Sequence, residues 1–359
     1  MDFLKILFVL WASAPIFNCS IISSVCQNLS SKCKCVDHIL DCSQVNLTDL
    51  DRVIESPTAD RSFFKIVNFS FNDLKILKRS FTAPFHKVET FDFSHNNLHK
   101  LENHNFVYNP NLKFLDLSHN VFHEIKKGQF AGLDSNLRAL NLSYNLLSSL
   151  ESDTFFHLRN LENLDLRSNF LTRLERGTFG SLTSLKILNL DDNDLATLSC
   201  KILTKLETLS LMYNSLTNFP ILGDNTNFKN LFLDGNFLGA IQTNALSSTP
   251  NVMQISMKNM HNLKSVEKCA FCGLPKLKRL ILSKNRHLTE IGTLAFGTEP
   301  LTEIDLSENK LTTLPFDLIF WDDEHKVKLK MGYNPWNCDC QMKWILNDGF
   351  REMIEDDPR

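Results

Sequence analysis

The chain has 359 residues, a length that suits either two or three ordinary domains or one elongated domain built of repeats. Its formal net charge is -3, with acidic and basic residues mixed along the sequence. This balance provides no basic field for nucleic acid, so we do not expect a nucleic-acid partner.

Residues 1–20 predict a secretory signal peptide. One basic residue, Lys5, precedes an apolar run from Ile6 to Phe17, and small polar residues follow. The run is shorter than the roughly 20 residues of a membrane span; an uncleaved anchor is the alternative. We therefore expect a protein that is secreted, or held on the extracellular face of the plasma membrane by a segment outside this sequence.

Residues 21–60 contain four cysteines, Cys26, Cys33, Cys35 and Cys42, in the spacing C-x6-C-x-C-x6-C. In an oxidising compartment, such a dense cluster predicts disulfide bonds. A zinc site is the alternative, but His38 is the only nearby histidine and the spacing fits no common zinc finger.

Residues 61–333 repeat one pattern. The segments "LKFLDLSHNVF", "LRALNLSYNLL" and "LENLDLRSNFL" share the template L-x-x-L-x-L-x-x-N-x-L. Its asparagine recurs about every 24 residues, with Met260 replacing it once, at positions 72, 96, 120, 145, 169, 193, 214, 236, 285, 309 and 334. A register kept over this length predicts a solenoid of eleven to twelve repeats.

The template also predicts the shape of each repeat. In L-x-L the leucines share one face of a short strand, because side chains alternate along a strand. The asparagine amide can satisfy backbone groups at the turn that follows. A second apolar signal, a phenylalanine, recurs about ten residues later at positions 81, 106, 130, 155, 179, 271 and 296. These rings are expected to stack as a spine behind the sheet and to curve the solenoid.

The repeats, together with the cysteine clusters at both ends, resemble extracellular leucine-rich-repeat proteins. The resemblance implies an α/β leucine-rich-repeat solenoid: a curved horseshoe with a parallel β-sheet on the concave face and a disulfide-bonded N-terminal cap. It also implies the pairings Cys26–Cys35 and Cys33–Cys42. Caps of this kind cover the apolar ends of a solenoid.

Three irregularities interrupt the repeats. Those ending at Asn214 and Asn236 are only 21 and 22 residues long, which marks either a recognition site or sequence drift. Cys269 and Cys272 form a C-x-x-C that we interpret as a structural disulfide, with unpaired thiols or a redox pair as alternatives. Cys200 lies three repeats from Cys269, too far for a disulfide bond.

Side chains between the strand leucines are expected to face the concave surface. Aromatic and arginine residues are enriched in interaction hot spots, so a contact patch centred on Phe232 is predicted, although isolated exposed apolar residues are also normal. The candidate binding residues are Met212, Tyr213, Asn230, Phe232, Arg279 and Lys284.

Four N-x-S/T sequons, at Asn28, Asn46, Asn68 and Asn141, are candidate glycosylation sites. The last two occupy concave strand positions, where the repeat consensus itself produces the sequence N-x-S. Glycans there would direct a protein ligand toward the later repeats or to the side of the solenoid.

No phosphate-binding loop, H-E-x-x-H motif or G-x-S-x-G motif is present in the sequence. We therefore expect no enzyme activity, cofactor or metal. His95 and His119 precede ladder asparagines at equivalent places in adjacent repeats. They could stack into a metal-binding or pH-sensing pair, or they could be solvent-facing variants of a freely varying position.

Residues 334–359 contain "NPWNCDC", which matches the start of a C-terminal cap in the family that the chain resembles. Cys338 and Cys340 have no cysteine after them. Either the sequence is part of a longer protein, or one of these thiols joins two chains; non-reducing electrophoresis distinguishes the two.

The function expected from the resemblance is recognition of an extracellular protein ligand or receptor through the repeat surface, in signalling or adhesion. Similar proteins include neurite-outgrowth and Toll-type receptors, matrix proteoglycans and Tsukushi-like regulators. The alternative is a structural protein that organises the extracellular matrix. The sequence predicts neither the ligand nor the oligomeric state.

Overall fold

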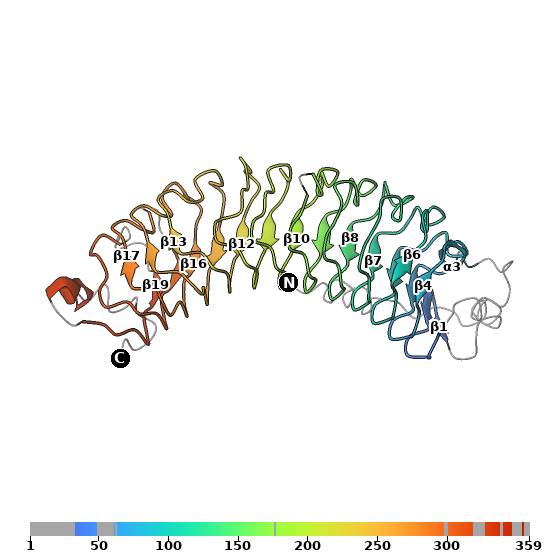
Figure 1. Cartoon of the computed structure of the whole chain (residues 1–359), viewed down its shortest axis with the longest axis horizontal. Helices are drawn as coiled ribbons and strands as arrows, with labels where there is room; N and C mark the ends of the chain where they lie inside the picture. The colour runs from blue at the N-terminus through green and yellow to red at the C-terminus, as the bar shows by residue number, and fades with distance from the viewer. Residues whose placement is uncertain are drawn as a thin grey trace. The chain divides into compact units, whose positions relative to one another are not determined.

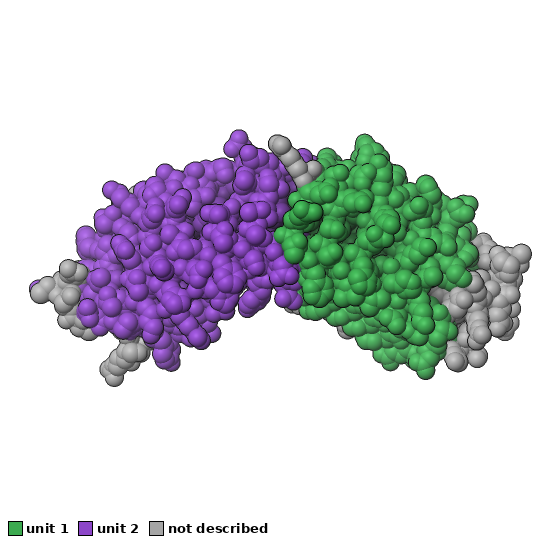
Figure 2. Space-filling view, in the orientation of Figure 1, with its two compact units in different colours: residues 1–188 green, residues 189–359 purple. Residues whose placement is uncertain are grey.

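The structure is a computed structural model that describes residues 33–48, 61, 63–175, 177–297, 301–318, 327–337, 340–346 and 354. It divides into two compact units, Met1–Leu188 and Asn189–Arg359, here called unit 1 and unit 2 (Figure 2). The expected signal peptide, Cys26, Asn28, Cys338 and the side chain of Cys340 lie outside the described part of the chain.

Unit 1 is a series of coils that each contribute one short strand to a main sheet (Figure 1). After an antiparallel pair, β1 and β2, each strand pairs in parallel with the strand of the next coil, in the order β2, β3, β5, β7, β8 and β9. A second, two-stranded parallel sheet joins β4 and β6. The elements are β1 (Lys34–Val36), β2 (Ile39–Asp41), β3 (Ile66–Asn68), β4 (Ile76–Leu77), α3 (Arg79–Thr82), β5 (Thr90–Asp92), β6 (Lys100–Leu101), β7 (Phe114–Asp116), β8 (Ala139–Asn141) and β9 (Asn163–Asp165).

Unit 2 repeats the same arrangement, with parallel pairing in the order β11, β12, β14, β16, β18 and β19. Its second sheet joins β13, β15 and β17. The strands are β11 (Thr208–Ser210), β12 (Asn230–Phe232), β13 (Ala240–Ile241), β14 (Gln254–Ser256), β15 (Ser265–Val266), β16 (Arg279–Ile281), β17 (Glu290–Ile291), β18 (Glu303–Asp305) and β19 (Lys328–Lys330). The 3-10 helix η1 (Cys340–Leu346) follows them, and β10 (Ile187–Asn189) spans the boundary between the units.

The predicted solenoid of parallel strands is confirmed within each unit, but the helical part of the α/β expectation is small. In the described ranges, α3 is the single α-helix and has four residues. The returns from one strand to the next consist mainly of turns instead. The described part of the chain also contains no helix long and apolar enough to cross a bilayer.

The template leucines form the core of every coil. Leu115 at the centre of β7 and Leu117 just after it are both 0% exposed, because alternate strand residues point to the same side. The predicted phenylalanine spine is also confirmed, since all seven rings are buried. In unit 1, the ring centroids of Phe130 and Phe155 lie 6.4 Å apart, and those of Phe155 and Phe179 lie 6.3 Å apart.

The ladder asparagines satisfy the turn that leaves each strand. The Nδ2 of Asn120 donates to the carbonyl oxygens of Leu117, Ser118 and, in the preceding coil, Phe93. Its Oδ1 accepts from the Leu98 amide of that preceding coil at 2.9 Å. One buried side chain therefore links two coils through four backbone groups, as the repeat pattern predicts.

The N-terminal cap has a Cys33–Cys42 disulfide that closes the β1–β2 hairpin. Cys35 is also disulfide-bonded; Cys26, its implied partner, is not among the described residues. In unit 2 a disulfide joins Cys269 to Cys272, while Cys200 is a buried free thiol. Burial raises the pKa of Cys200 to about 12, so this thiol is not a reactive nucleophile.

Candidate protein-recognition surface

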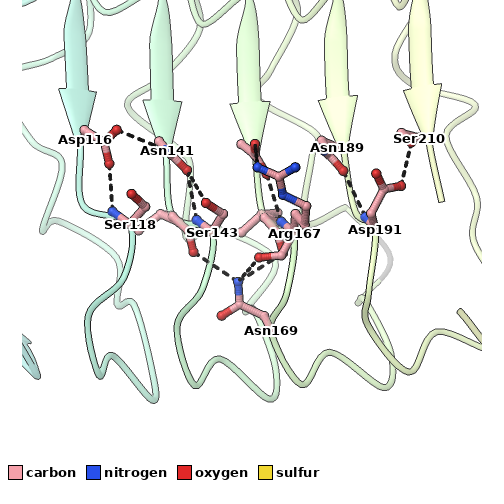
Figure 3. Close-up of polar contacts among 12 residues, drawn as sticks. Asp116, Ser118, Asn141, Ser143, Arg167, Asn169, Asn189, Asp191 and Ser210 are labelled. Carbon is pink, nitrogen blue, oxygen red and sulfur yellow. Dashed lines mark hydrogen bonds and ion pairs between the residues drawn. The ribbon is translucent and has the colours of Figure 1, made fainter. Parts of the chain in front are cut away.

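The exposed face of the main sheet in each unit, here called the strand face, is formed by the first and third residues of the short strands. Its third positions in unit 1 are less accessible than the alternation of side chains predicts. Asp116 is 7% exposed and Asn141 is 6% exposed. Their side chains bend back to cap the chain as it leaves the strand (Figure 3).

The geometry of this cap is repeated from coil to coil. Asp116 Oδ1 accepts from the Ser118 amide at 2.9 Å, and Asn141 Oδ1 accepts from the Ser143 amide at 3.0 Å. Asn141 Nδ2 donates to Asp116 Oδ2 at 3.0 Å and so joins adjacent coils. An aspartate or asparagine two residues before a turn commonly makes this bond. These polar residues therefore stabilise the solenoid and are poorly placed to contact a ligand.

Burial changes the ionisation of the strand-face carboxyls. It raises the pKa of Asp116 to about 7, with a further contribution from the nearby Asp92 carboxyl, while hydrogen bonds from Ser118 and Asn141 oppose the increase. Burial also raises the pKa of Asp92 and of Asp165. The strand face of unit 1 is consequently less charged near neutral pH than a count of its carboxylates indicates.

In two coils of unit 2 the capping aspartate comes from a different position, whereas Asn189 and Asp305 keep the arrangement of unit 1. Asp191 Oδ1 accepts from Ser210 Oγ at 2.5 Å (Figure 3) and from the Met212 amide at 2.8 Å. Asp234 Oδ1 makes the equivalent pair of bonds to Ser256 Oγ and the Lys258 amide. In these two coils, an aspartate beyond one strand thus caps the next coil together with a serine at the third strand position. In the coil between them the third strand position is Phe232, whose side chain can make neither of these capping bonds.

Four of the six predicted contact residues lie on adjacent coils of unit 2. Phe232 ends β12 and is half-buried, in register with Ser210 on one side and Ser256 on the other. Asn230 begins the same strand and donates through Nδ2 to Thr208 Oγ1 at 3.0 Å. On the preceding coil, Tyr213 is 57% exposed and Met212 is half-buried. We call these four residues, Met212, Tyr213, Asn230 and Phe232, the aromatic patch.

The other two predicted contact residues, Arg279 and Lys284, are separate from the aromatic patch. Arg279 begins β16, two strands from β12, and its Nε lies 2.7 Å from Glu303 Oε2. Lys284 Nζ lies 3.5 Å from Glu308 Oε1. Both positive charges form ion pairs within the chain, so an acidic ligand would have to compete with a glutamate for each of them.

A column of stacked rings in unit 1 was only partly foreseen. The sequence identified His95 and His119 as equivalent positions, but Phe71 and Tyr144 occupy the same position in the flanking coils and extend the stack. All four ring residues can be identified from the sequence, because each directly precedes a ladder asparagine.

The described sequons differ in accessibility. Asn46 is exposed, whereas Asn68 and Asn141 are buried, and their Oδ1 atoms accept bonds from Ser70 and Ser143. A glycan on Asn141 would also modify the nitrogen that donates to Asp116. Asn46 is therefore the most accessible of these three sequon asparagines, and glycosylation of the sequons stays a prediction.

Comparison with protein families identifies the repeat. A model described as leucine rich repeat matches residues 86–135, 122–169, 135–195, 159–216 and 226–286, which together cover more than half of the chain.

Individual relatives are similar over part of their length. The NT-3 growth factor receptor of Sus scrofa is 31% identical over 115 residues, which are 31% of this chain and 13% of the receptor. The Oplophorus-luciferin 2-monooxygenase non-catalytic subunit of Oplophorus gracilirostris is 27% identical over 193 residues, 46% of this chain and 53% of that protein. The chain thus spans about half or less of these relatives.

Among solved structures, one described as the LRIM1/APL1C complex resembles the fold with a TM-score of 0.63 and 23% identity. The match covers 84% of this chain and 58% of the chain it resembles. At this identity the similarity supports the fold and carries no information about the ligand.

Proposed function

We propose, since the chain belongs to the leucine-rich-repeat family, that it is a recognition module that binds an extracellular protein through the aromatic patch of unit 2. The observation that carries the proposal is the replacement of a capping polar residue by Phe232 on the strand face, with the exposed ring of Tyr213 on the preceding coil. Open solenoid faces bind large partners, whereas enclosed pockets suit small substrates.

The patch has the physical properties of an interaction anchor. Aromatic side chains provide large contact areas and lose little conformational entropy on binding. Phe232 is already half-buried between Ser210 and Ser256. Both neighbours in register are small and part of Phe232 remains exposed, so a partner could cover this residue without rearranging the sheet.

An extracellular setting is supported by the Cys33–Cys42 and Cys269–Cys272 disulfides, because such bonds persist in oxidising compartments. The expected signal peptide agrees with this setting. One relative is a growth factor receptor by name and another is a non-catalytic subunit, and both names are compatible with a non-enzymatic role in protein binding.

Affinity capture from extracellular medium or cell surfaces tests the proposal. Three secreted forms are compared: the unmodified chain, Phe232→Asp in the patch, and Phe170→Asp as a control at a 54% exposed ring in unit 1. We expect one protein to be captured by the unmodified chain and by Phe170→Asp, and to be lost with Phe232→Asp at equal secretion. Capture that survives Phe232→Asp would place the interface elsewhere.

A further inference from the structure

Four rings in unit 1 form a continuous stack along the edge where the chain leaves the strands. Phe71, His95, His119 and Tyr144 come from four consecutive coils. The centroid distances between successive rings are 4.1, 4.0 and 4.1 Å, and the interplanar angles are 8°, 11° and 10°. The two central members of the stack are the ionisable imidazoles.

The backbone holds these rings in place. All four residues have left-handed backbone conformations, with φ between 51° and 55°. Apart from glycine, few residues adopt this region, and asparagine, aspartate and histidine do so most often. The amides of His95 and His119 donate to the carbonyl oxygens of Ser118 and Ser143 in the next coils. These bonds fix the spacing of the coils that carry the two imidazoles, so the rings stay adjacent unless their side chains rotate out of the stack.

Charged groups surround the imidazole pair. Asp92, in β5, lies close enough to His95 to favour its protonation, whereas Arg167, just after β9, disfavours protonation of His119. Asp116, in β7, and Asp41, in β2, interact with Asp92. The Arg167 guanidinium Cζ also lies 5.5 Å from the centroid of Tyr144, at the end of the stack.

We propose that His95 and His119 together form a pH-sensitive element of unit 1, in which the stack is stable with neutral imidazoles and loosens when acidification protonates them. The ring centroids lie 4.0 Å apart, so two imidazolium charges would repel each other at close range. Burial also raises the pKa of the Asp92 and Asp116 carboxyls, so acidification removes negative charge that could compensate the imidazolium charges.

The direction of the effect follows from the pKa shifts. Burial is the largest cause of a lowered pKa for both histidines, and His95 further lowers the pKa of His119. The folded chain therefore binds fewer protons than the unfolded chain just below the ordinary histidine pKa of about 6.5. This contribution to stability is present at pH 7.5 and is lost as the pH falls through about 6.5. Asp116 acts in the opposite direction, so the histidine contribution must be isolated by substitution.

The double variant His95→Phe/His119→Phe isolates the contribution of the two histidines to the pH dependence of stability. The same column already accepts Phe71, so stacking is retained while both titrating groups are removed. The matched control is His99→Gln/His123→Gln, which removes two exposed histidines four residues further along the same coils. The thermal midpoint of each full-length protein is measured between pH 7.5 and 5.0.

We expect the midpoint of the unmodified chain, relative to the double phenylalanine variant, to fall by about 2–4 °C on acidification. The thermal midpoint of the control variant should change with pH in the same way as that of the unmodified chain. Parallel pH profiles for the unmodified chain and the double phenylalanine variant would overturn the proposal, as would a control that also removes the pH dependence.

A second measurement keeps the test decisive if the double variant does not fold. NMR titration of the histidine Cε1 protons gives the pKa of His119 in the unmodified chain and in the single variant His95→Phe. Removing the neighbouring charge should raise the pKa of His119 toward its ordinary value. An unchanged His119 pKa would show that the two imidazoles titrate independently, contrary to the proposal.

Discussion

The ring of Tyr213 lies directly against the backbone of Gly235 in the next coil. A Cβ added to Gly235 would be 2.5 Å from Tyr213 Cδ1 and 2.9 Å from Cε1. Gly235 also has a φ of +73°, in the left-handed region. The absence of a side chain at this position therefore lets the exposed tyrosine ring lie against the backbone of the next coil, three residues after Phe232.

Gly235→Ala should consequently displace Tyr213 and weaken partner binding. We expect a loss of about 1–2 kcal/mol in the free energy of unfolding from the left-handed backbone alone, and a further loss from the clash with the ring. Gly273→Ala is the matched control, because its φ is +78° but no atom lies within 4 Å of the added Cβ. Chemical denaturation and partner binding check both variants. If Gly235→Ala had the same stability and the same partner affinity as the control, the contact between Gly235 and Tyr213 would have no special role.

The phenylalanine spine gives a stability prediction. Phe130 is 0% exposed and packs against Phe155, so Phe130→Ala should lower the free energy of unfolding by about 3–5 kcal/mol. Phe170→Ala truncates a ring that is 54% exposed and should cost far less. Denaturant unfolding of the secreted proteins measures both changes. Equal losses would exclude a special contribution from the spine.

The sequence predicted the repeating strand, the asparagine ladder and the phenylalanine spine because each depends on interactions that recur at a fixed spacing. Leu115, Asn120 and Phe130 each have counterparts at the equivalent position in neighbouring coils, where they meet chemically similar partners. The helical content was harder to predict, since the returns between strands lack a strict pattern and most consist of turns.

The recognition surface was less predictable because it depends on contacts between coils that differ in sequence. Alternation placed Asp116 and Asn141 on the exposed face but could not show that both side chains cap a turn and become buried. The pairing of Arg279 with Glu303 likewise arises only when separate coils are stacked. Phe232 could be placed on the face from alternation alone, whereas the fit of Tyr213 against Gly235 required the structure.

A ladder asparagine should be more important to stability than an exposed asparagine in a neighbouring turn. Asn120→Ala removes a donor to three carbonyl oxygens and an acceptor for the Leu98 amide. A buried group left without a partner costs about 1–3 kcal/mol, so we expect a total loss of at least about 2 kcal/mol. Asn97→Ala, at an exposed position that contacts Asp73, is the control. Similar unfolding midpoints for the two variants would argue against the ladder as a major source of stability.

The buried carboxyl of Asp116 predicts a component of stability that increases on acidification. Its pKa is raised to about 7 from an ordinary value near 3.8, so the folded chain binds an additional proton between these values. The stabilisation is complete below about pH 3.8 and is lost as the pH rises to about 7. Its slope is at most about 1.4 kcal/mol per pH unit.

Asp116→Asn should remove this component. The absolute stability should also fall at every pH, because the asparagine cannot accept from Ser118 and Asn141 as two carboxylate oxygens do. The informative quantity is therefore the difference in unfolding free energy between the unmodified chain and the variant, measured by urea denaturation from pH 5 to 8. We expect that difference to grow in favour of the unmodified chain as the pH falls from 7 to 5. Glu124→Gln, which removes an exposed carboxylate from the same coil, should leave the pH dependence unchanged. A difference between the unmodified chain and Asp116→Asn that stays constant with pH would mean that Asp116 titrates as an ordinary carboxyl.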